Sequence, residues 1–320
     1  MRRFADCCVR TVALTGATGF VGRATLERLL AEDVSVKALV RPGRHLPAAE
    51  RLTSIAGSLD DSNSLLRLVS GCDTIIHIAG SISGRNYVDL ARTNASGCRR
   101  LIDAIRTGCP TARLVHVSSL AAREPALSDY AASKRAGEDL VTTSKLDWLI
   151  IRPPAVYGPD DPALATLWRL LARGLLPRIG SPQARFSLLH VSDLAAALVN
   201  AGLQSRIPIE RDDRLVCLHD GRQGGYSWQD IAEIASQRRQ GTVRTIPVPP
   251  ALLRTVGTLN LFGARLAGRT PPVLVPGKVA ELVHPDWVCD NTQLPGCPEW
   301  KPLKMFADCL TNLPGWSRYR

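Results

Sequence analysis

The chain has 320 residues, of which 45% are hydrophobic and 22% charged, a size and balance that exclude a disordered or fibrous protein and fit one or two globular domains. Lys and Arg outnumber Asp and Glu by 40 to 29, for a formal charge of +11, but the basic residues are scattered in short pairs without interleaved aromatic residues, so we expect no nucleic acid as a partner. The nine cysteines form no C-x-x-C pair, which predicts reduced thiols and no bound metal.

The first half of the chain alternates apolar runs with helix-length amphipathic segments. Strands that are almost continuously apolar are covered by helices on both faces, which is typical of a parallel sheet with right-handed crossovers. We therefore predict a doubly wound α/β fold of the Rossmann type, with strands at residues 11–15, 34–40, 73–79, 113–117 and 146–151.

The alternation breaks up after Pro153 and Pro154, where prolines punctuate the chain. Predicted strands at 188–190, 214–218 and 243–246 then alternate with helices at 192–201, 227–239 and 250–266. We expect a dinucleotide-binding domain over 10–158, with 186–220 partly returning to it. Residues 159–185 and 221–320 are expected to form a smaller C-terminal α/β lobe that binds the substrate.

A glycine-rich turn follows the first predicted strand and precedes a helix, which is the context of a dinucleotide site. Gly16 permits a tight turn, Gly19 lets the backbone approach a pyrophosphate, and Gly22 lets the helix pack against the strand. Free N–H groups at the start of the helix then attract the phosphates. A plain structural turn is the alternative, and the position favours cofactor binding by Gly16, Thr18, Gly19, Phe20, Val21 and Gly22.

The second predicted strand ends in Arg41, where NAD sites normally carry a carboxylate for the ribose hydroxyls. The Arg41 guanidinium, with help from Arg44, is able to pair with a 2′-phosphate, so NADP is favoured slightly over NAD. The alternative is a solvated loop arginine in an arginine-rich chain.

Tyr130 and Lys134 lie four residues apart in a helical segment, which puts both side chains on one face. A nearby ammonium lowers the pKa of a phenol, so Tyr130 is predicted to exchange a proton with a substrate hydroxyl. Lys134 is also placed to hold the nicotinamide ribose. Ser119, with Ser118 as the alternative, follows a predicted strand at the sheet edge where α/β proteins bind ligands, and is predicted to orient the substrate oxygen.

These motifs occur together with four others: I-H-I-A-G at 76–80, N-x-x-G at 94–97, R-P-x-x-x-Y-G-P at 152–159 and H-V-x-D-x-A at 190–195. The whole set resembles the extended branch of the short-chain dehydrogenase/reductase superfamily, the NAD-dependent epimerases and dehydratases. The resemblance implies a catalytic tetrad of Asn94, Ser119, Tyr130 and Lys134. It further implies cofactor contacts from Leu59, Ala79, Gly80, Lys134 and Pro153, and substrate contacts from Ser81, Ser119 and Tyr130.

Two departures from the family pattern concern the ligands. The Y-G pair that many sugar-nucleotide members carry after the active-site serine is absent from 119–125, which weakens the expectation of sugar contacts there. Ser58 replaces the acid that usually meets the adenine in the family's G-D-L-x-D segment.

The resemblance implies an NAD(P)-dependent oxidoreductase of epimerase or dehydratase type, acting on a small molecule whose default class is a nucleotide sugar. Arg185 is predicted either to pair with the substrate diphosphate or to stabilise the fold. Two alternatives stay open: an NADPH-dependent carbonyl reductase or hydroxysteroid-type dehydrogenase, and a cofactor-binding assembly subunit without catalysis. Because the sequence has no membrane-spanning segment and no signal peptide, we expect a cytoplasmic protein without membrane insertion. By analogy with relatives it forms a homodimer.

Overall fold

A computed structural model describes residues 9–204, 214–291, 293–294 and 297–319. Seven parallel strands form its central sheet in the order β11-β6-β5-β4-β1-β2-β3. Their bounds are β1 Arg10–Thr15, β2 Val34–Val40, β3 Leu52–Ala56, β4 Thr74–His77, β5 Arg113–Val117, β6 Asp147–Arg152 and β11 Leu215–Cys217. The predicted Rossmann fold is confirmed.

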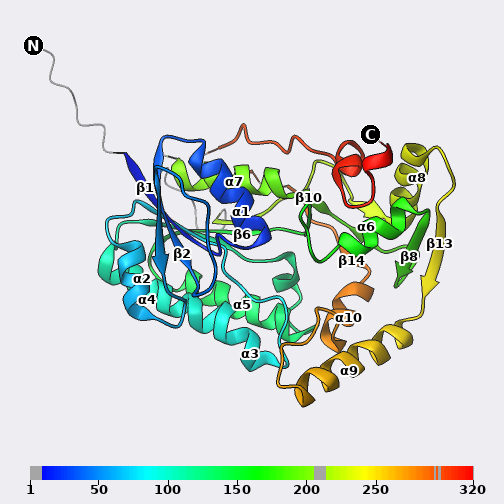
Figure 1. Cartoon of the computed structure of the whole chain (residues 1–320), viewed down its shortest axis with the longest axis horizontal. Coiled ribbons are helices and arrows are strands. Elements are labelled where there is room, and N and C mark those ends of the chain that lie inside the picture. Colours follow the sequence, from blue (N-terminus) through cyan, green and yellow to red (C-terminus); the bar gives the residue numbers. More distant parts are fainter. Residues whose placement is uncertain (1–8, 205–213, 292, 295–296, 320) are drawn as a thin grey trace, which may run out of the picture.

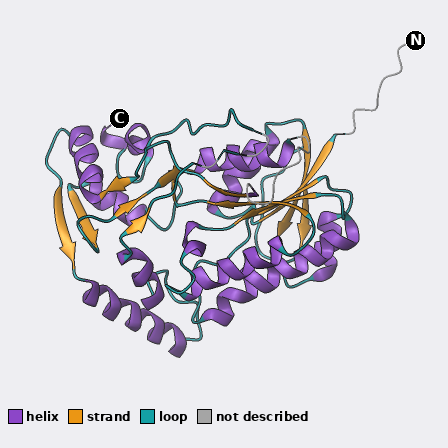
Figure 2. Ribbon diagram, turned by 180° about the vertical axis from the view of Figure 1, so that it is seen from behind, coloured by secondary structure: helices purple, strands orange, loops and turns teal. Residues whose placement is uncertain are grey.

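Helices cover both faces of this sheet (Figures 1 and 2). On one face α1 (Phe20–Leu30) packs against α7 (Val191–Leu203), and on the other lie α2 (Ser62–Val69), α4 (Cys98–Gly108) and α5 (Asp129–Thr142). All residues of β4 and β5 are buried, which is why the central residues of both strands are apolar. The short helix α3 (Tyr87–Ala91) leads into a π-helical turn over Arg92–Gly97.

The sheet has two strands that lie outside the five predicted in the first half. β3 was missed because it lies at the sheet edge with exposed and half-buried residues, so that it lacks an apolar run. β11 falls within the predicted strand 214–218 and extends the sheet beside β6. The strand predicted over 73–79 ends at His77, because the chain leaves the sheet there toward the glycine-rich turn. Residues 205–213 of the segment expected to return to this domain lie outside the described residues.

The second lobe lies beside the carboxyl ends of the parallel strands (Figure 1). A hydrophobic core of its own, built around Tyr157, Trp168, Phe306 and Trp316, holds this lobe together. Its strands are β7 Ala155–Tyr157, β8 Leu175–Ile179, β9 Arg185–Phe186, β10 Leu188–His190, β12 Tyr226–Ser227, β13 Arg244–Val248 and β14 Asp286–Trp287. Its helices are α6 Ala165–Ala172, α8 Trp228–Arg239, α9 Pro250–Leu266, α10 Pro276–Val283 and α11 Phe306–Cys309.

Seven cysteines fall within the described residues and all are free thiols, as predicted; Cys7 and Cys8 lie outside that part of the chain. In the same residues, no helix combines the length and the apolar character that crossing a membrane requires.

Candidate active site

The glycine-rich turn joins β1 to α1 at the sheet edge and has the shape of a dinucleotide cradle. Gly16 has a φ of +79°, and a Cβ there would lie 2.7 Å from the backbone nitrogen of Ala79. A Cβ on Gly22 would lie only 2.0 Å from the Gly16 carbonyl oxygen. Both positions therefore require glycine, because a side chain at either one would collide with backbone.

The amino end of α1 is suited to bind an anion. Its N-cap residue, Gly19, has no side chain to occupy the free N–H groups, and the first turn carries no acidic residue. The unsatisfied N–H groups and the helix dipole favour a phosphate at this point. Thr18 and Phe20 are half-buried beside this end, and Val21 packs against the hydrophobic core between the sheet and the helices α1 and α7. The turn thus fits the diphosphate of a dinucleotide.

The other predicted cofactor residues surround this turn. Arg41 is exposed just beyond the end of β2. Leu59 is buried, and Ala79 donates its N–H to Thr15 Oγ1 at 3.2 Å. A Cβ on Gly80 would lie 3.1 Å from Asn94 Oδ1 and 3.7 Å from Lys134 Nζ, so this backbone borders the predicted tetrad. The buried Pro153, beyond the end of β6, accepts the Leu120 N–H at 2.9 Å.

Asn94 lies in the π-helical turn and holds the loop that follows β4. Its Oδ1 accepts the Ser81 N–H at 2.8 Å, and its Nδ2 donates to the Ser81 carbonyl and to Ser133 Oγ, both at 2.9 Å. This buried amide therefore clamps the backbone of Ser81 onto α5. Its place at a π-helical turn agrees with the frequent use of such turns at functional sites.

The two consecutive serines after β5 have different surroundings. The buried Ser118 donates its hydroxyl to Glu138 Oε1 at 2.5 Å, and Glu138 in turn pairs with Arg152 at 2.5 Å. Ser119 lines a cavity together with Tyr130. A hydrogen bond with Ser119 also lowers the pKa of Tyr130. The geometry therefore favours Ser119 over Ser118 as the serine that meets a substrate.

Tyr130 and Lys134 both belong to α5, but the charge that acts on the phenol differs from the predicted one. Burial raises the pKa of Tyr130 above its usual value, and only partial compensation comes from Lys278 and from Ser119. The Lys278 Nζ lies 5.4 Å from the centre of the Tyr130 ring. The expectation that Lys134 lowers this pKa is not met, because burial dominates and the cation that opposes it is Lys278.

Lys134 is buried and points back toward the sheet. Its Nζ donates to the Val117 carbonyl at 2.7 Å, and burial lowers the pKa of its ammonium to about 8. Behind it lie His77 and His116, neighbours on β4 and β5, with ring centres 5.2 Å apart. Burial, with Lys134 adding to it, lowers the pKa of His77 to about 3 and that of His116 well below its usual value. Both imidazoles are therefore neutral beneath the lysine.

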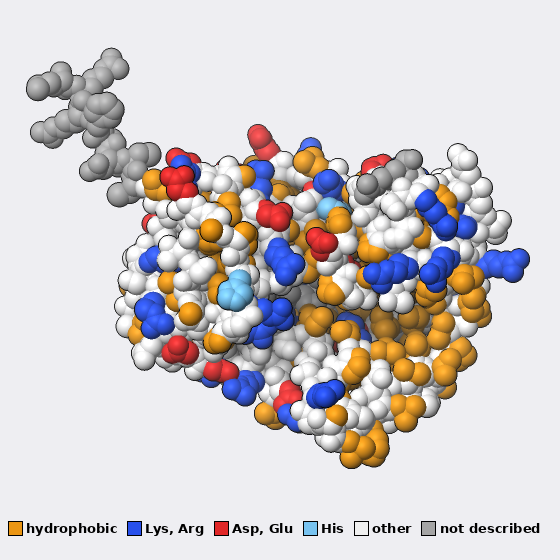
Figure 3. Space-filling model, in the orientation of Figure 1, with side chains coloured by type: hydrophobic (Ala, Val, Ile, Leu, Met, Phe, Trp, Pro, Cys, Tyr) orange, Lys and Arg blue, Asp and Glu red, His pale blue; other side chains and the backbone are white. Residues whose placement is uncertain are grey.

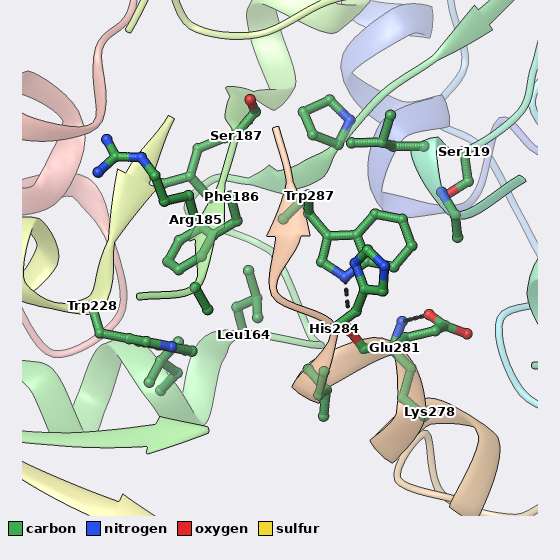
Figure 4. A pocket seen from close by; sticks show the side chains of 18 of the residues that line it. Ser119, Leu164, Arg185, Phe186, Ser187, Trp228, Lys278, Glu281, His284 and Trp287 are labelled. Carbon is green, nitrogen blue, oxygen red and sulfur yellow. Dashed lines mark hydrogen bonds and ion pairs between the residues drawn. The ribbon is translucent and has the colours of Figure 1, made fainter. Parts of the chain in front are cut away.

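A cavity of about 300 Å³ lies beside Ser119 and Tyr130, between the two lobes (Figure 4). The second lobe contributes most of its wall, which is largely aliphatic and aromatic. The leucine, isoleucine, phenylalanine and tryptophan residues that line it are Leu120, Leu164, Leu167, Trp168, Phe186, Leu188, Trp228, Ile231, Leu282 and Trp287.

Arg185 lies on the side of this cavity away from Ser119 (Figure 4). Its Nε donates to the Gly224 carbonyl at 2.6 Å and its Nη2 to the Gly225 carbonyl at 3.0 Å. The guanidinium thus holds a turn of the second lobe, which agrees with the alternative that it stabilises the fold.

Sequence reasoning missed two charged residues of α10 that face Tyr130. Lys278 Nζ pairs with Glu281 Oε2 at 2.7 Å, and Ser128 donates to Glu281 Oε1 at 2.5 Å (Figure 4 shows the Lys278–Glu281 pair). The pair therefore connects the second lobe to the start of α5. The only available signal was a Lys and a Glu three residues apart within the apolar segment P-G-K-V-A-E-L-V, a pattern equally typical of a surface ion pair.

Comparison with known proteins identifies the family. The sequence profile described as "NAD dependent epimerase/dehydratase family" matches residues 12–208. The chain belongs to this family. Its predicted character as an NAD(P)-dependent oxidoreductase is confirmed.

Two relatives and one solved structure show what this chain is similar to. "Ceramide reductase" of Caulobacter vibrioides (strain NA1000 / CB15N) is 38% identical over 310 residues, which cover 96% of this chain and 94% of the relative. The "4-hydroxy-2-methyl-3-oxo-4-farnesyl-3,4-dihydroquinoline-1-oxide ketoreductase" of Stigmatella aurantiaca is 30% identical over 172 residues, 47% of this chain and 51% of that one. The structure "MoeE5 in complex with UDP-glucuronic acid and NAD" has a TM-score of 0.71 at 19% identity, covering 97% of this chain and 99% of that one, and shares the fold.

Proposed function

We propose that this protein is a carbonyl reductase for a long-chain lipid ketone of the ceramide class, in which a keto group becomes a secondary hydroxyl. The observation that carries the proposal is the apolar cavity beside Ser119 and Tyr130. The name of the relative that is 38% identical over almost the whole chain points to the same substrate class. A ketone flanked by alkyl chains suits a wall of leucines and tryptophans.

In this proposal a bound NAD(P)H supplies the hydride to the carbonyl carbon. Tyr130 donates the proton that the carbonyl oxygen gains, and its raised pKa keeps the phenol protonated and ready for this direction. Ser119, which lines the same cavity and lowers the pKa of Tyr130, donates to the same carbonyl oxygen and orients it. Lys134 and Asn94 act less directly: Lys134 holds the nicotinamide ribose, and Asn94 fixes the Ser81 backbone next to the site.

A nucleotide sugar, the default of the family, is less well supported as the substrate. Its diphosphate needs cations with free donors. The Arg and Lys side chains on the cavity wall are already partly engaged: Arg185 donates to two carbonyl groups and Lys278 is paired with Glu281, so a diphosphate would have to share them with these partners. The missing Y-G pair after Ser119 points the same way.

The finer expectations about the cofactor and the assembly stay proposals. We propose a preference for NADP over NAD because Arg41 is exposed at the end of β2, where a 2′-phosphate would lie. The cytoplasmic location and the homodimer stay predictions.

The test is a turnover assay with purified protein and NADPH or NADH. The substrates are a detergent-dispersed ceramide analogue with its secondary hydroxyl oxidised to a ketone and, separately, UDP-glucose and dTDP-glucose. We expect reduction of the ketone, and a loss of about 10²- to 10⁴-fold in kcat for Tyr130→Phe with cofactor binding unchanged. Tyr87→Phe, which removes a hydroxyl from an exposed tyrosine of α3, is the matched control and keeps full activity. Turnover of a nucleotide sugar without consumption of the ketone would refute the proposal.

A further inference from the structure

The outer face of α9 is unusually apolar for a surface helix. Five large side chains on this helix are exposed: Leu252 by 56%, Val256 by 38%, Leu259 by 63%, Phe262 by 60% and Leu266 by 74%. Their spacing of three or four residues puts them along one side of the helix. The opposite side contributes the buried Gly257 and Ala264, which pack inward. Figure 3 shows hydrophobic side chains gathered over the part of the surface where Figure 1 places α9 and β13.

The charged side chains of the segment that carries this face have one sign. Residues 234–280 contain six arginines and one lysine but no Asp or Glu. Arg254, Arg265 and Arg269 are exposed on or just after α9, and Arg244 is exposed on β13. On the neighbouring helix α3, Asp89 is already paired with Arg85 at 2.7 Å. An exposed apolar stripe flanked by arginines is the pattern of a helix that lies in the interface of an anionic bilayer.

The face also borders the route into the active site. A second cavity of about 450 Å³ is lined by Leu261 and Arg265 of α9, and it shares Tyr130, Lys278 and Glu281 with the cavity beside Ser119. The first cavity has room for the carbons around a ketone but not for two long alkyl chains. The second cavity therefore gives the rest of such a molecule a path from the active site toward α9.

We propose that the apolar face of α9 docks this protein onto the surface of a membrane that contains anionic lipids. The leucines and Phe262 enter the acyl boundary while the flanking arginines meet lipid phosphates. The positive charge of this segment argues against a second copy of the chain as the occupant, because two such faces would bring arginines against arginines. The docking itself does not depend on the substrate, whereas its use for taking a ketone directly from the bilayer rests on the proposed function.

The test is co-sedimentation of the full chain with vesicles of phosphatidylglycerol and phosphatidylcholine in equal amounts, compared with vesicles of phosphatidylcholine alone. We expect the partition coefficient to be at least about tenfold larger on the anionic vesicles and to fall in high salt. Leu259→Glu combined with Phe262→Glu should lower binding about tenfold or more. Arg254→Gln combined with Arg269→Gln should remove most of the preference for anionic vesicles, since each arginine near such a surface contributes about a fivefold factor.

Leu303→Glu is the matched control, because Leu303 is 86% exposed in the segment whose backbone bonds to Asp193 on α7, on the far side of the molecule from α9 (Figure 1). It should bind vesicles like the unchanged protein.

Thermal unfolding of every variant checks that it is folded. Equal binding of the unchanged protein and the Leu259/Phe262 variant would overturn the proposal. A second result would also overturn it: sedimentation velocity shows that the unchanged protein is a dimer and the variant a monomer, and neither protein binds vesicles. Turnover of a short-chain, water-soluble ketone by the variant separates a failure of docking from a failure of the proposed function.

Discussion

Arg41 is the residue proposed to distinguish NADP from NAD. It follows β2 directly and is exposed, at the edge of the sheet where the glycine-rich turn also lies. A guanidinium at this place is able to form two parallel hydrogen bonds to a 2′-phosphate, and it offers nothing comparable to the ribose hydroxyls of NAD. The choice of cofactor therefore depends on one side chain.

Arg41→Ala should raise the KM for NADPH by about tenfold or more and leave the KM for NADH nearly unchanged, because only the phosphate contact is lost. Steady-state kinetics with both cofactors measures this. Arg51→Ala is the control, since Arg51 is an exposed arginine paired with Asp33. A strong preference for NADH that Arg41→Ala does not alter would show that the arginine is a solvated loop residue.

At the scale of elements, three pieces of the first lobe meet at a buried charge pair. Ser118 at the end of β5, Glu138 on α5 and Arg152 at the end of β6 form one chain of short hydrogen bonds. All three side chains are buried, so each charge depends on the other. The junction fixes the end of β5, and with it the place of Ser119, relative to Tyr130 on α5.

Ser118→Ala should therefore cost about 1 kcal/mol of stability and leave kcat within a few-fold, because the lost hydroxyl supports the junction and does not face the cavity. Ser119→Ala should do the reverse, with a large loss in kcat and little change in stability. Glu138→Gln should cost about 3 to 5 kcal/mol, since it leaves the Arg152 charge buried without its partner. Urea unfolding and kcat on the same samples test all three. Equal losses of kcat for the two serine variants would contradict this assignment.

The elements also show what the sequence was able to predict. β1, β2, β4, β5 and β6 are largely buried, so their apolar runs were visible, and local spacing was enough to place Tyr130 and Lys134 on one helix. The two-residue strands β9, β12 and β14 carry no period that a sequence reveals. The Lys278–Glu281 pair was invisible for another reason. Its partner Ser128 lies 153 residues away in the sequence, and only the packing of α10 on α5 brings them together.

At the scale of the whole molecule, the active site is completed by the second lobe. α5 supplies Tyr130 from the first lobe, and α10 supplies Lys278 above its ring from the second. Glu281 ties the two helices through Ser128, so the cation is held in place over the phenol. The lobe that shapes the cavity thereby also sets the acidity of the residue proposed to donate the proton.

Lys278→Met tests this coupling between the lobes. The Lys278 ammonium lowers the pKa of Tyr130 while Glu281 raises it, so removing the lysine and leaving the carboxylate should raise that pKa further. Ketone reduction needs the protonated phenol, so the decline of kcat/KM at alkaline pH should move to higher pH. Alcohol oxidation needs the phenolate, so the increase of its kcat/KM with pH should also shift to higher pH. Near neutral pH, oxidation should therefore become slower while reduction changes little. The pH profiles in both directions measure these shifts, with Lys301→Met, at an exposed position, as the control. Profiles that stay unchanged would mean that Lys278 only binds the two lobes together, and profiles that move to lower pH would mean that Tyr130 is not the group that titrates.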